Sequence, residues 1–322
     1  MEGYWVWCGS VIRGDDGRYY MFASRWPKGI SFNPHWLTNS EVVRASSDTP
    51  EGPYAFEEIV LPVRGERYWD GRMTHNPTIH KSGGTYLLYY TGTTYTGHTP
   101  TPENPCPIDG AMRMEARANQ RIGLATAPSV FGPWTRRDEP ILQPRPGKWD
   151  SMMNCNPAPC VLDGGAVLLV YKAVGHQKDL LRLGVAKADR IEGPYVRLRD
   201  DPIFNFDATG DHVEDAYVWR SKGGGFEMLM KDMAGGISGE RHAGIHATSP
   251  DGVNWTVSSP ALAYSLTVLW DDGATTKQSA LERPQVLVQN GEPTHLFAAT
   301  GDGPARQKWN NTWNMVFPLK TA

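Results

Sequence analysis

The sequence has few cysteines, no long apolar run and almost no net charge. Its 322 residues include four cysteines, and their spacing matches no zinc-binding pattern. No apolar run approaches the roughly 20 residues that span a bilayer. The formal net charge is −3 and the sequence pI is about 6.3. These properties indicate no surface for nucleic acid and no association with an anionic membrane.

The four cysteines, Cys8, Cys106, Cys155 and Cys160, are expected to be free and mostly buried thiols. Cys155 and Cys160 would lie on one strand, where neighbours rarely reach disulfide geometry. Free thiols favour the cytoplasm. The first expected strand begins at Tyr4, with no signal peptide before it. Because a leader can be trimmed, the sequence leaves the location open between cytoplasm and periplasm.

One motif occurs twice in the chain. Residues 69–77 and 149–157, which lie 80 positions apart, share Trp, Asp, Met, Asn and Pro at the same offsets. Each copy leads into an apolar run, a glycine turn and a second apolar run, which is the pattern of a β-hairpin. An internal repeat of this kind indicates a repeat architecture.

Three further segments, 9–22, 214–230 and 282–298, fit the same hairpin template, with Gly9 aligned to Asn76. A tight turn followed by an aromatic residue closes most units, as at 51–54, 131–134 and 192–195. The pattern predicts an all-β, single-domain five-bladed β-propeller with four-stranded antiparallel blades. The blades are expected at approximately 4–64, 69–145, 149–205, 211–265 and 280–320 of a single domain, 1–322.

The first inner strand is expected to begin with almost nothing before it, so no N-terminal strand would join the last blade. Residues 312–319 would then complete the fifth blade alone. Ring closure would depend on side-chain packing by Trp5, Trp7, Trp313 and Phe317, each contributing roughly 1.5–3 kcal/mol when buried.

Long irregular loops are predicted on one face of the ring, at 25–40, 93–119, 174–180, 233–243 and 301–312. The opposite face has short glycine turns. Long loops on a rigid scaffold usually carry function, and the first residues of the inner strands would look across that face. In chain order these are Cys8-Gly9, His75-Asn76, Cys155-Asn156, Glu214-Asp215 and Glu282-Arg283.

Glu214 and Glu282 stand at equivalent positions of adjacent blades, and Asp215 follows the first. Paired carboxylates are the groups that cleave glycosidic bonds, so these three are the catalytic candidates. The substrate-binding candidates are His75, Asn76, Asn156, Asp70, Asp150, Arg283, Trp26, Arg121, Lys172 and His242. No definite cofactor is indicated, and a structural divalent cation in the central channel is left open.

Structural roles are open for several of these residues. Glu282 could form an ion pair with Arg283 that braces the channel. Asp70 and Asp150 could cap the turns into their inner strands, because both copies of the repeat keep the aspartate. His75 could be a satisfied structural histidine.

These blade motifs resemble the five-bladed glycoside hydrolases of family 43 and the related family 117. The resemblance covers the whole chain, and its most familiar pieces are 121–127, 132–134 and 282–287. It implies that Glu214, at the opening of the fourth inner strand, is the general acid. In the family one Asp tunes the general acid and another Asp is the general base. This chain has Asn156 at the first of these positions and Gly9 at the second. The base would then be Glu282 or Asp215.

The resemblance implies an exo-acting glycoside hydrolase, inverting in outcome, that removes a terminal sugar from plant or algal oligosaccharides. One alternative is a polysaccharide lyase that uses His75 or His242 as base and Arg241 or Arg283 to neutralise a uronate. Another is a non-catalytic carbohydrate-binding propeller. The sequence identifies neither the sugar and its linkage nor the oligomeric state.

Overall fold

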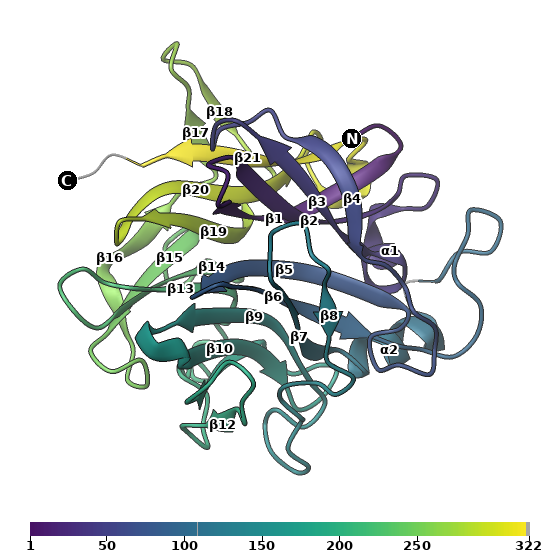
Figure 1. Ribbon diagram of the computed structural model, residues 1–322, viewed down its shortest axis with the longest axis horizontal. Helices are drawn as coiled ribbons and strands as arrows, with labels where there is room; N and C mark the ends of the chain where they lie inside the picture. Colours follow the sequence, from purple (N-terminus) through teal and green to yellow (C-terminus); the bar gives the residue numbers. More distant parts are fainter. Residues whose placement is uncertain (108, 320–322) are drawn as a thin grey trace.

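The structure is a computed structural model that describes residues 1–107 and 109–319. Its main strands form five antiparallel sheets arranged around a central axis (Figure 1). The predicted five-bladed β-propeller is therefore confirmed. Among the described residues, no helix is long and apolar enough to cross a membrane.

The first four blades each contain four strands in chain order, from the axis outward. Blade one consists of β1 (Tyr4–Arg13), β2 (Tyr19–Pro27), β3 (Glu41–Ser47) and β4 (Ala55–Leu61). Blade two consists of β5 (Met73–Ser82), β6 (Thr85–Thr93), β7 (Arg121–Ala127) and β8 (Thr135–Arg136). Blade three consists of β9 (Met153–Val161), β10 (Val167–Val174), β11 (Arg182–Ala188) and β12 (Val196–Arg197). Blade four consists of β13 (Val213–Arg220), β14 (Phe226–Asp232), β15 (Gly244–Ser249) and β16 (Thr256–Tyr264).

The fifth blade has three strands in the part of the chain that the structure describes: β19 (Glu282–Gln289), β20 (Glu292–Gly301) and β21 (Thr312–Pro318). Four strands were expected there. A separate hairpin, β17 (Thr267–Leu269) and β18 (Thr275–Lys277), lies between blades four and five in the chain. Residue 320, the predicted end of this blade, lies outside the described residues.

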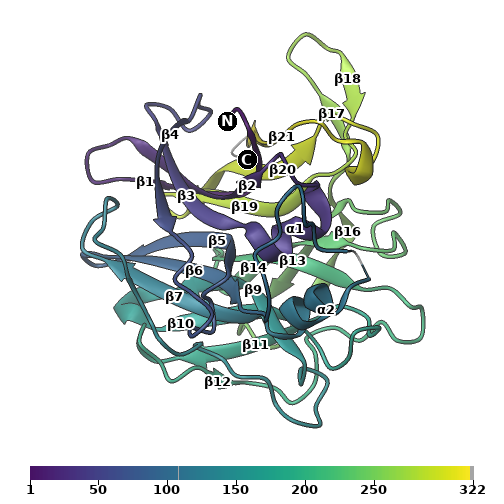
Figure 2. The same cartoon turned by 90° about the vertical axis from the view of Figure 1, so that its right-hand side faces the viewer.

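Two of the loops predicted to be irregular contain short helices, α1 (Phe32–Asn39) and α2 (Ala111–Ala118). One 3₁₀ turn, η1 (Asp163–Gly165), connects β9 and β10. A second, η2 (Arg306–Lys308), lies in the loop between β20 and β21. The helices lie side by side on one face (Figure 2). Helices of eight residues are marginal alone, and buried side chains such as Leu37 and Ala116 anchor these two. Their packing, rather than a sequence pattern, therefore determines them.

Each inner strand contains a bulge just after it begins. The residue at the bulge has a positive φ in all five blades: 58° at Cys8, 50° at Asn76, 50° at Asn156, 60° at Asp215 and 55° at Arg283. The register between the first two strands of each blade shifts at the same place. A bulge of this kind redirects a side chain out of the regular alternation of the strand.

The equivalence of the bulges corrects the predicted alignment by one position, because Cys8, and not Gly9, corresponds to Asn76. Gly9 lies where a Cβ atom would approach Met21 Sδ within 2.7 Å and Asn314 Cγ within 2.8 Å. Glycine is therefore required at position 9 by the close approach of neighbouring side chains, and it offers no side chain to the channel.

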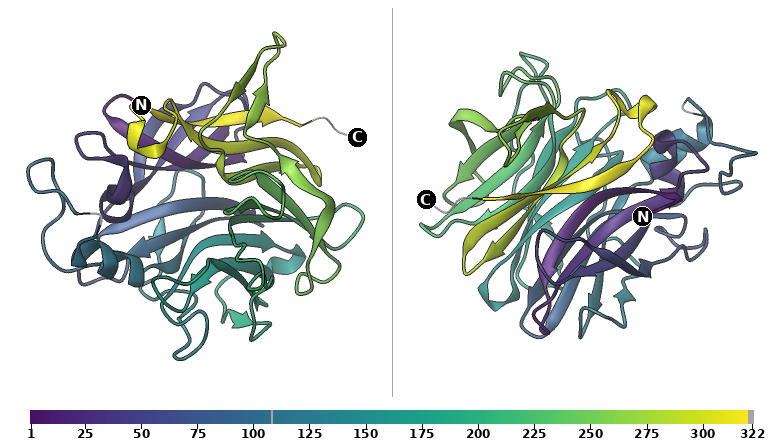
Figure 3. Two further views of the ribbon diagram at one scale, coloured as in Figure 1. Left: turned by 180° about the vertical axis from the view of Figure 1, so that it is seen from behind. Right: turned by 90° about the horizontal axis from the view of Figure 1, so that it is seen from above.

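Blades one and five meet without a shared sheet. Strand β1 lies beside β19 and β21 but pairs only with β2 (Figures 1 and 3). The prediction that no N-terminal strand joins the last blade is thus confirmed for the described residues. The hydrogen bonds that cross this seam include one from Val6 N–H to Thr312 Oγ1 at 2.8 Å and one from Gly9 N–H to Asn314 Oδ1 at 2.8 Å.

The apolar part of the seam differs from the prediction. Trp5 and Trp7 are buried there, as expected, and Trp7 packs on Trp309 with ring centroids 5.2 Å apart. Trp313 is 40% exposed, and Phe317 packs beside Leu266 and Tyr264 instead. Trp309, from an irregular loop, therefore takes the role predicted for Trp313.

Candidate functional site

A polar pocket of about 70 Å³ opens at the propeller axis, on the face that carries α1 and η2. That volume is room for about five water molecules. The pocket is lined by Trp7, Phe32, Trp36, His75, Asn76, Asn156, Lys172, Glu214, Asp215, Glu282, Arg283 and Arg306. All five inner strands contribute, and the residue from β1 is the aromatic Trp7. The pocket therefore lies where the five blades converge.

The five bulge residues form what we call the channel ring: Cys8, Asn76, Asn156, Asp215 and Arg283. Cys8 Sγ–H donates to Asn76 Oδ1 at 2.8 Å, and burial raises the pKa of this thiol well above its ordinary value. Asn76 Nδ2 donates to Asn156 Oδ1 at 2.6 Å, and Asn156 Nδ2 donates to Asp215 Oδ1 at 2.9 Å. The chain of hydrogen bonds passes through four blades and stops at Arg283, whose Nη1 lies 3.8 Å from Asp215 Oδ1.

The channel ring does not suit the divalent cation that was left open. It offers one carboxylate, and a guanidinium occupies the fifth position. Among residues 1–107 and 109–319, no group of three or more His, Cys, Asp or Glu side chains could hold a metal ion. A cation at the axis would be repelled by Arg283 and Lys231.

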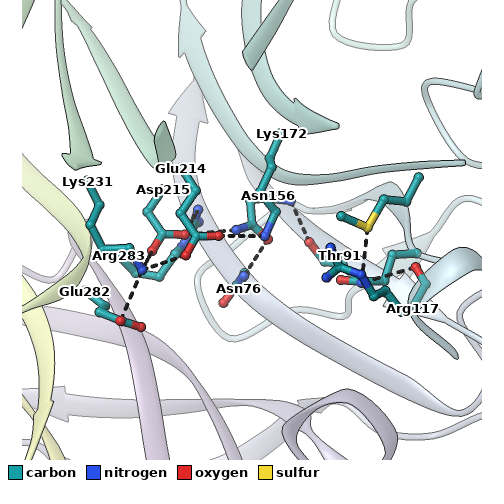
Figure 4. A network of polar contacts seen from close by, with 12 residues as sticks. Asn76, Thr91, Arg117, Asn156, Lys172, Glu214, Asp215, Lys231, Glu282 and Arg283 are labelled. Atoms are coloured by element: carbon teal, nitrogen blue, oxygen red, sulfur yellow. Dashed lines mark hydrogen bonds and ion pairs between the residues drawn. The ribbon is translucent and has the colours of Figure 1, made fainter. Parts of the chain in front are cut away.

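Lys231, on β14, joins the three candidate carboxylates. Its Nζ lies 2.6 Å from Glu214 Oε1, 3.1 Å from Glu282 Oε1 and 3.2 Å from Asp215 Oδ2 (Figure 4). The lysine is fully buried. Burial disfavours its ammonium form, but Glu214, Glu282 and Asp215 outweigh burial and raise the pKa of Lys231. A permanent positive charge therefore sits between the carboxylates.

Two further cations neutralise the glutamates. Lys172 Nζ lies 3.0 Å from Glu214 Oε2, and Arg306 forms an ion pair with Glu282. Burial opposes ionisation of Glu214, but Lys172 and Lys231 hold its pKa well below the ordinary value. For Glu282 burial is likewise outweighed, and Arg306 and Lys231 lower the pKa to about 2. Both glutamates are thus ionised at neutral pH.

Because one ammonium contacts both glutamates, an oxygen of Glu214 lies within about 6 Å of an oxygen of Glu282. Carboxyl pairs of inverting glycosidases are roughly 6.5–9.5 Å apart, whereas those of retaining enzymes are about 5–5.5 Å apart. The approach of the two oxygens is closer to the second geometry. The inverting outcome expected from the sequence stays a prediction, which the anomer of the first product would test.

His75 is a buried member of the pocket, with Nδ1 2.8 Å from Ser40 Oγ and its ring 5.1 Å from that of Trp36. Burial lowers the pKa of His75 well below its ordinary value, and Arg283 and Lys172 lower it further. The imidazole is therefore neutral and adds no charge to the pocket.

The repeat contained a signal for Lys231. In register, Lys231 pairs with Glu214 and Lys172 pairs with Cys155, so the two lysines occupy the same position of adjacent second strands. In both copies the lysine follows an apolar run. The sequence prediction chose Lys172 and missed Lys231. Arg306, Trp7, Phe32 and Trp36 were also missed, and three of these four belong to loops without periodicity.

Asp70 and Asp150 lie away from the pocket, so their positions argue against the predicted contact with substrate. Both are fully buried. Asp70 accepts from Arg64 Nε at 2.6 Å and from Tyr90 Oη at 2.7 Å. Asp150 accepts from the Nε of Arg145 at 2.9 Å and from that of Arg197 at 2.7 Å. The repeated aspartate thus forms ion pairs with arginines, whereas the structural role considered from the sequence was a cap of the turn into the inner strand.

Three other predicted substrate-binding residues do not line the pocket. Trp26 is buried behind it, with its ring 5.8 Å from His75. Arg121 Nη1 donates to the carbonyls of Ala118 and Gln120 at the end of α2, so its charge is used there. His242 lies in the loop before β15 and is half-buried.

The open alternative of a Glu282–Arg283 ion pair is absent from the described residues, because Glu282 pairs with Lys231 and Arg306. The four cysteines are free and buried, as predicted.

The fold and the site together define a five-bladed β-propeller with a carboxylate–lysine cluster at its axis. No family model and no curated protein matches the sequence. Solved structures do match. A family 117 glycoside hydrolase from the marine bacterium Zobellia galactanivorans is 18% identical, with a TM-score of 0.65 over 98% of this chain and 83% of that one.

A second structure, described as a glycoside hydrolase, is 17% identical with a TM-score of 0.69, covering 100% of this chain and 89% of that one. A family 43 β-xylosidase/α-arabinofuranosidase from a compost microbial metagenome is 15% identical with a TM-score of 0.61, covering 100% and 93%. At these identities the similarity shows the fold. Both families named by the sequence resemblance are among the similar structures.

Proposed function

We propose that this protein is a glycoside hydrolase that removes a terminal sugar from plant or algal oligosaccharides. The observation that supports this most is the pair formed by Glu214 and Glu282, which occupy the same position of adjacent blades and meet at Lys231 in the axial pocket. A single small pocket at the propeller axis suits one sugar at a chain end better than an extended polymer. The similar structures of families 117 and 43 support the same class of activity.

In this proposal Glu282 is the nucleophile and Glu214 is the general acid. Glu282 is ionised at neutral pH because Arg306 and Lys231 lower its pKa to about 2, and an ionised carboxylate is what attack on the anomeric carbon requires. The close approach of the two glutamates favours retention of configuration. Glu214 must carry a proton to assist the leaving group, so binding of substrate must offset the effect of its two lysines.

Asp215 has a supporting role in this scheme. Its Oδ1 accepts a hydrogen bond from Asn156 and its Oδ2 forms an ion pair with Lys231, so both oxygens are engaged. It holds the lysine that neutralises the two glutamates. The pocket aromatic side chains, Trp7 and Trp36, supply apolar faces against which a sugar ring can pack.

The test is a screen of aryl glycosides and of plant and algal oligosaccharides, followed by substitution of the two glutamates. Glu214→Gln should lower kcat by about 10²–10⁴ on a substrate with a poor leaving group. Glu292→Gln is the matched control, because Glu292 lies at the start of β20 in an exposed pair with Lys222. Activity of the Glu214 variant within a few-fold of the parent would exclude the assigned role, and NMR of the first product anomer would decide between retention and inversion.

A polysaccharide lyase is the second candidate, because neutral His75 lies in the same pocket as the guanidinium of Arg283. A lyase needs a base and a group that neutralises a uronate. Its product is an unsaturated sugar that absorbs in the ultraviolet, whereas a hydrolase produces a new reducing end without such absorbance. A propeller that only binds carbohydrate would show neither product and would bind equally well after Glu214→Gln.

A further inference from the structure

Among the described residues, Arg283 is the cation of this cluster that has neither a hydrogen-bond partner nor a carboxylate oxygen closer than 3.8 Å. Its side chain is 2% exposed, and Nε, Nη1 and Nη2 all lack an acceptor. The nearest carboxylate oxygen, Asp215 Oδ1, is 3.8 Å from Nη1, which is too long for a hydrogen bond. Buried guanidinium groups carry five N–H donors that are normally satisfied. The N–H donors of the Arg283 guanidinium are therefore free to bind a ligand at the pocket wall.

The other three cations are fully engaged. Lys231 contacts three carboxylates, Lys172 contacts Glu214, and Arg306 contacts Glu282. Four cations thus face three carboxylates, and His75 contributes no charge. The cluster has an excess of one positive charge, and Arg283 is its most weakly paired cation. A ligand with a single negative charge would balance it.

The backbone directs this side chain to the axis. Arg283 has φ 55° at the bulge of β19, the position that holds Cys8, Asn76, Asn156 and Asp215 in the other blades. Those four residues are linked to each other by hydrogen bonds. Arg283 completes the channel ring but takes no part in these hydrogen bonds, so its N–H donors stay available to a ligand in the pocket.

We propose that Arg283 binds a carboxylate group of the substrate, so that the terminal sugar recognised by this pocket is a uronic acid or another carboxylated sugar. The ligand class rests on the proposed function in that a sugar is what the site binds. A guanidinium fork matches a carboxylate through two parallel hydrogen bonds. A carboxylate attached directly to the ring is also more compact than a sulfate ester, which suits a small pocket.

This inference supplies the protonation that the proposed mechanism requires. A substrate carboxylate near Arg283 and Lys172 would reduce the positive field on Glu214. A nearby negative charge favours the neutral form of a carboxyl group, so the pKa of Glu214 would rise when the substrate binds. Binding of an acidic sugar would therefore favour protonation of Glu214, the proposed general acid, whereas a neutral sugar would leave Glu214 ionised.

The first experiment needs no variant. Isothermal titration calorimetry of the full chain compares D-glucuronate and D-galacturonate with their uncharged amides and with sulfated galactose. We expect at least one acid to bind roughly 10- to 100-fold more tightly than its amide, the range for hydrogen bonds to a charged group. Equal binding of acid and amide in both pairs would overturn the proposal, and tighter binding of the sulfated sugar would overturn the choice of carboxylate.

The second experiment removes the guanidinium. Arg283→Met should abolish the preference for the acid, and Arg283→Lys should retain part of it through charge alone. Arg220→Met, an exposed position at the far end of β13, is the control and should keep the full preference. If Arg283→Met does not fold, the comparison of acids with amides in the parent still decides the matter. An unchanged preference in a folded Arg283→Met variant would overturn the proposal.

Turnover separates this inference from the proposed function. Binding that depends on the carboxylate and on Arg283, without release of a reducing end from any aryl uronide or oligouronide, would refute hydrolysis and leave the ligand class intact. Hydrolysis of neutral glycosides that Arg283→Met does not affect would refute the ligand class and leave hydrolysis intact.

Discussion

Replacement of Lys231 by methionine is the most informative perturbation of this fold. The lysine is fully buried and lies within 3.2 Å of oxygens of Glu214, Asp215 and Glu282. Methionine fills a similar volume but leaves the three carboxylates with Lys172 and Arg306 as their remaining close cations. Removing one partner of a buried ion pair costs about 3–5 kcal/mol. We expect a loss of that size in the free energy of unfolding at pH 7.

The pH dependence of this loss carries a definite sign. In the parent protein the pKa of Glu282 is lowered from 4.5 to about 2. A depressed carboxyl pKa stabilises the fold above the unfolded pKa, and this contribution is lost as the pH falls toward the folded pKa. At 1.36 kcal/mol per pH unit it amounts to roughly 3 kcal/mol, lost between about pH 5 and pH 2. In Lys231→Met the carboxyl pKa values rise, so acidification relieves the repulsion between them.

The difference in stability between parent and variant should therefore narrow as the pH falls from 7 to 4. Urea denaturation at pH 7, 5.5 and 4 measures it. With a denaturant slope of about 3 kcal/mol/M, the expected loss shifts the midpoint by roughly 1–1.7 M at pH 7. Lys222→Met is the control, since this lysine is 73% exposed and its pair with Glu292 should contribute less than about 1 kcal/mol at every pH. A midpoint within 0.3 M of the parent (about 1 kcal/mol on the same slope), or a difference that does not change with pH, would refute the reasoning.

Three further outcomes are expected. Trp309→Ala should lower stability by about 3–5 kcal/mol, and Trp313→Ala, at a site 40% exposed, by about 1 kcal/mol or less; equal losses in thermal or urea unfolding would contradict the assigned seam. Asp150→Asn should destabilise by about 3 kcal/mol because the half-buried Arg145 and Arg197 lose their shared buried carboxylate, and Arg145 keeps only the exposed Asp200. KM should be unchanged, and a tenfold rise in KM would place Asp150 in the site after all. Lys172→Met removes a cation beside Glu214 and should therefore raise the pKa of this carboxyl group. If Glu214 is the general acid, the alkaline limb of the kcat/KM profile should move to higher pH. A limb that stays in place would assign the proton to another group.

The blade repeat could be predicted from the sequence because its determinants are local. A strand, a glycine turn and a second strand follow one another within about 20 residues, and the alternation of apolar positions is written into each run. The equivalence of Glu214 and Glu282 followed from the same repeat, and the structure brings both to one pocket. The free cysteines and the absence of an N-terminal strand in the last blade were predictable on the same grounds.

Positions that depend on one residue of register were beyond the sequence. The bulge adds one residue to each inner strand, and a shift of one residue moves a side chain to the other face of the sheet. The alignment of Gly9 with Asn76 failed for this reason, although Cys8 was next to it. The duplicated Asp70 and Asp150 looked like a site, but duplication also preserves an ion pair within each blade.

The charge balance of the pocket was decided only by the tertiary structure. Lys231 comes from a second strand, Arg306 from an irregular loop and Arg283 from the last blade, and no spacing along the chain relates them. Their effect on Glu214 and Glu282 depends on distances of about 3 Å in a buried site, where a displacement of about 3 Å halves the Coulomb energy. Local pattern therefore determined the blades and their equivalent positions, and three-dimensional proximity determined which charges are paired and which single guanidinium is left without a partner.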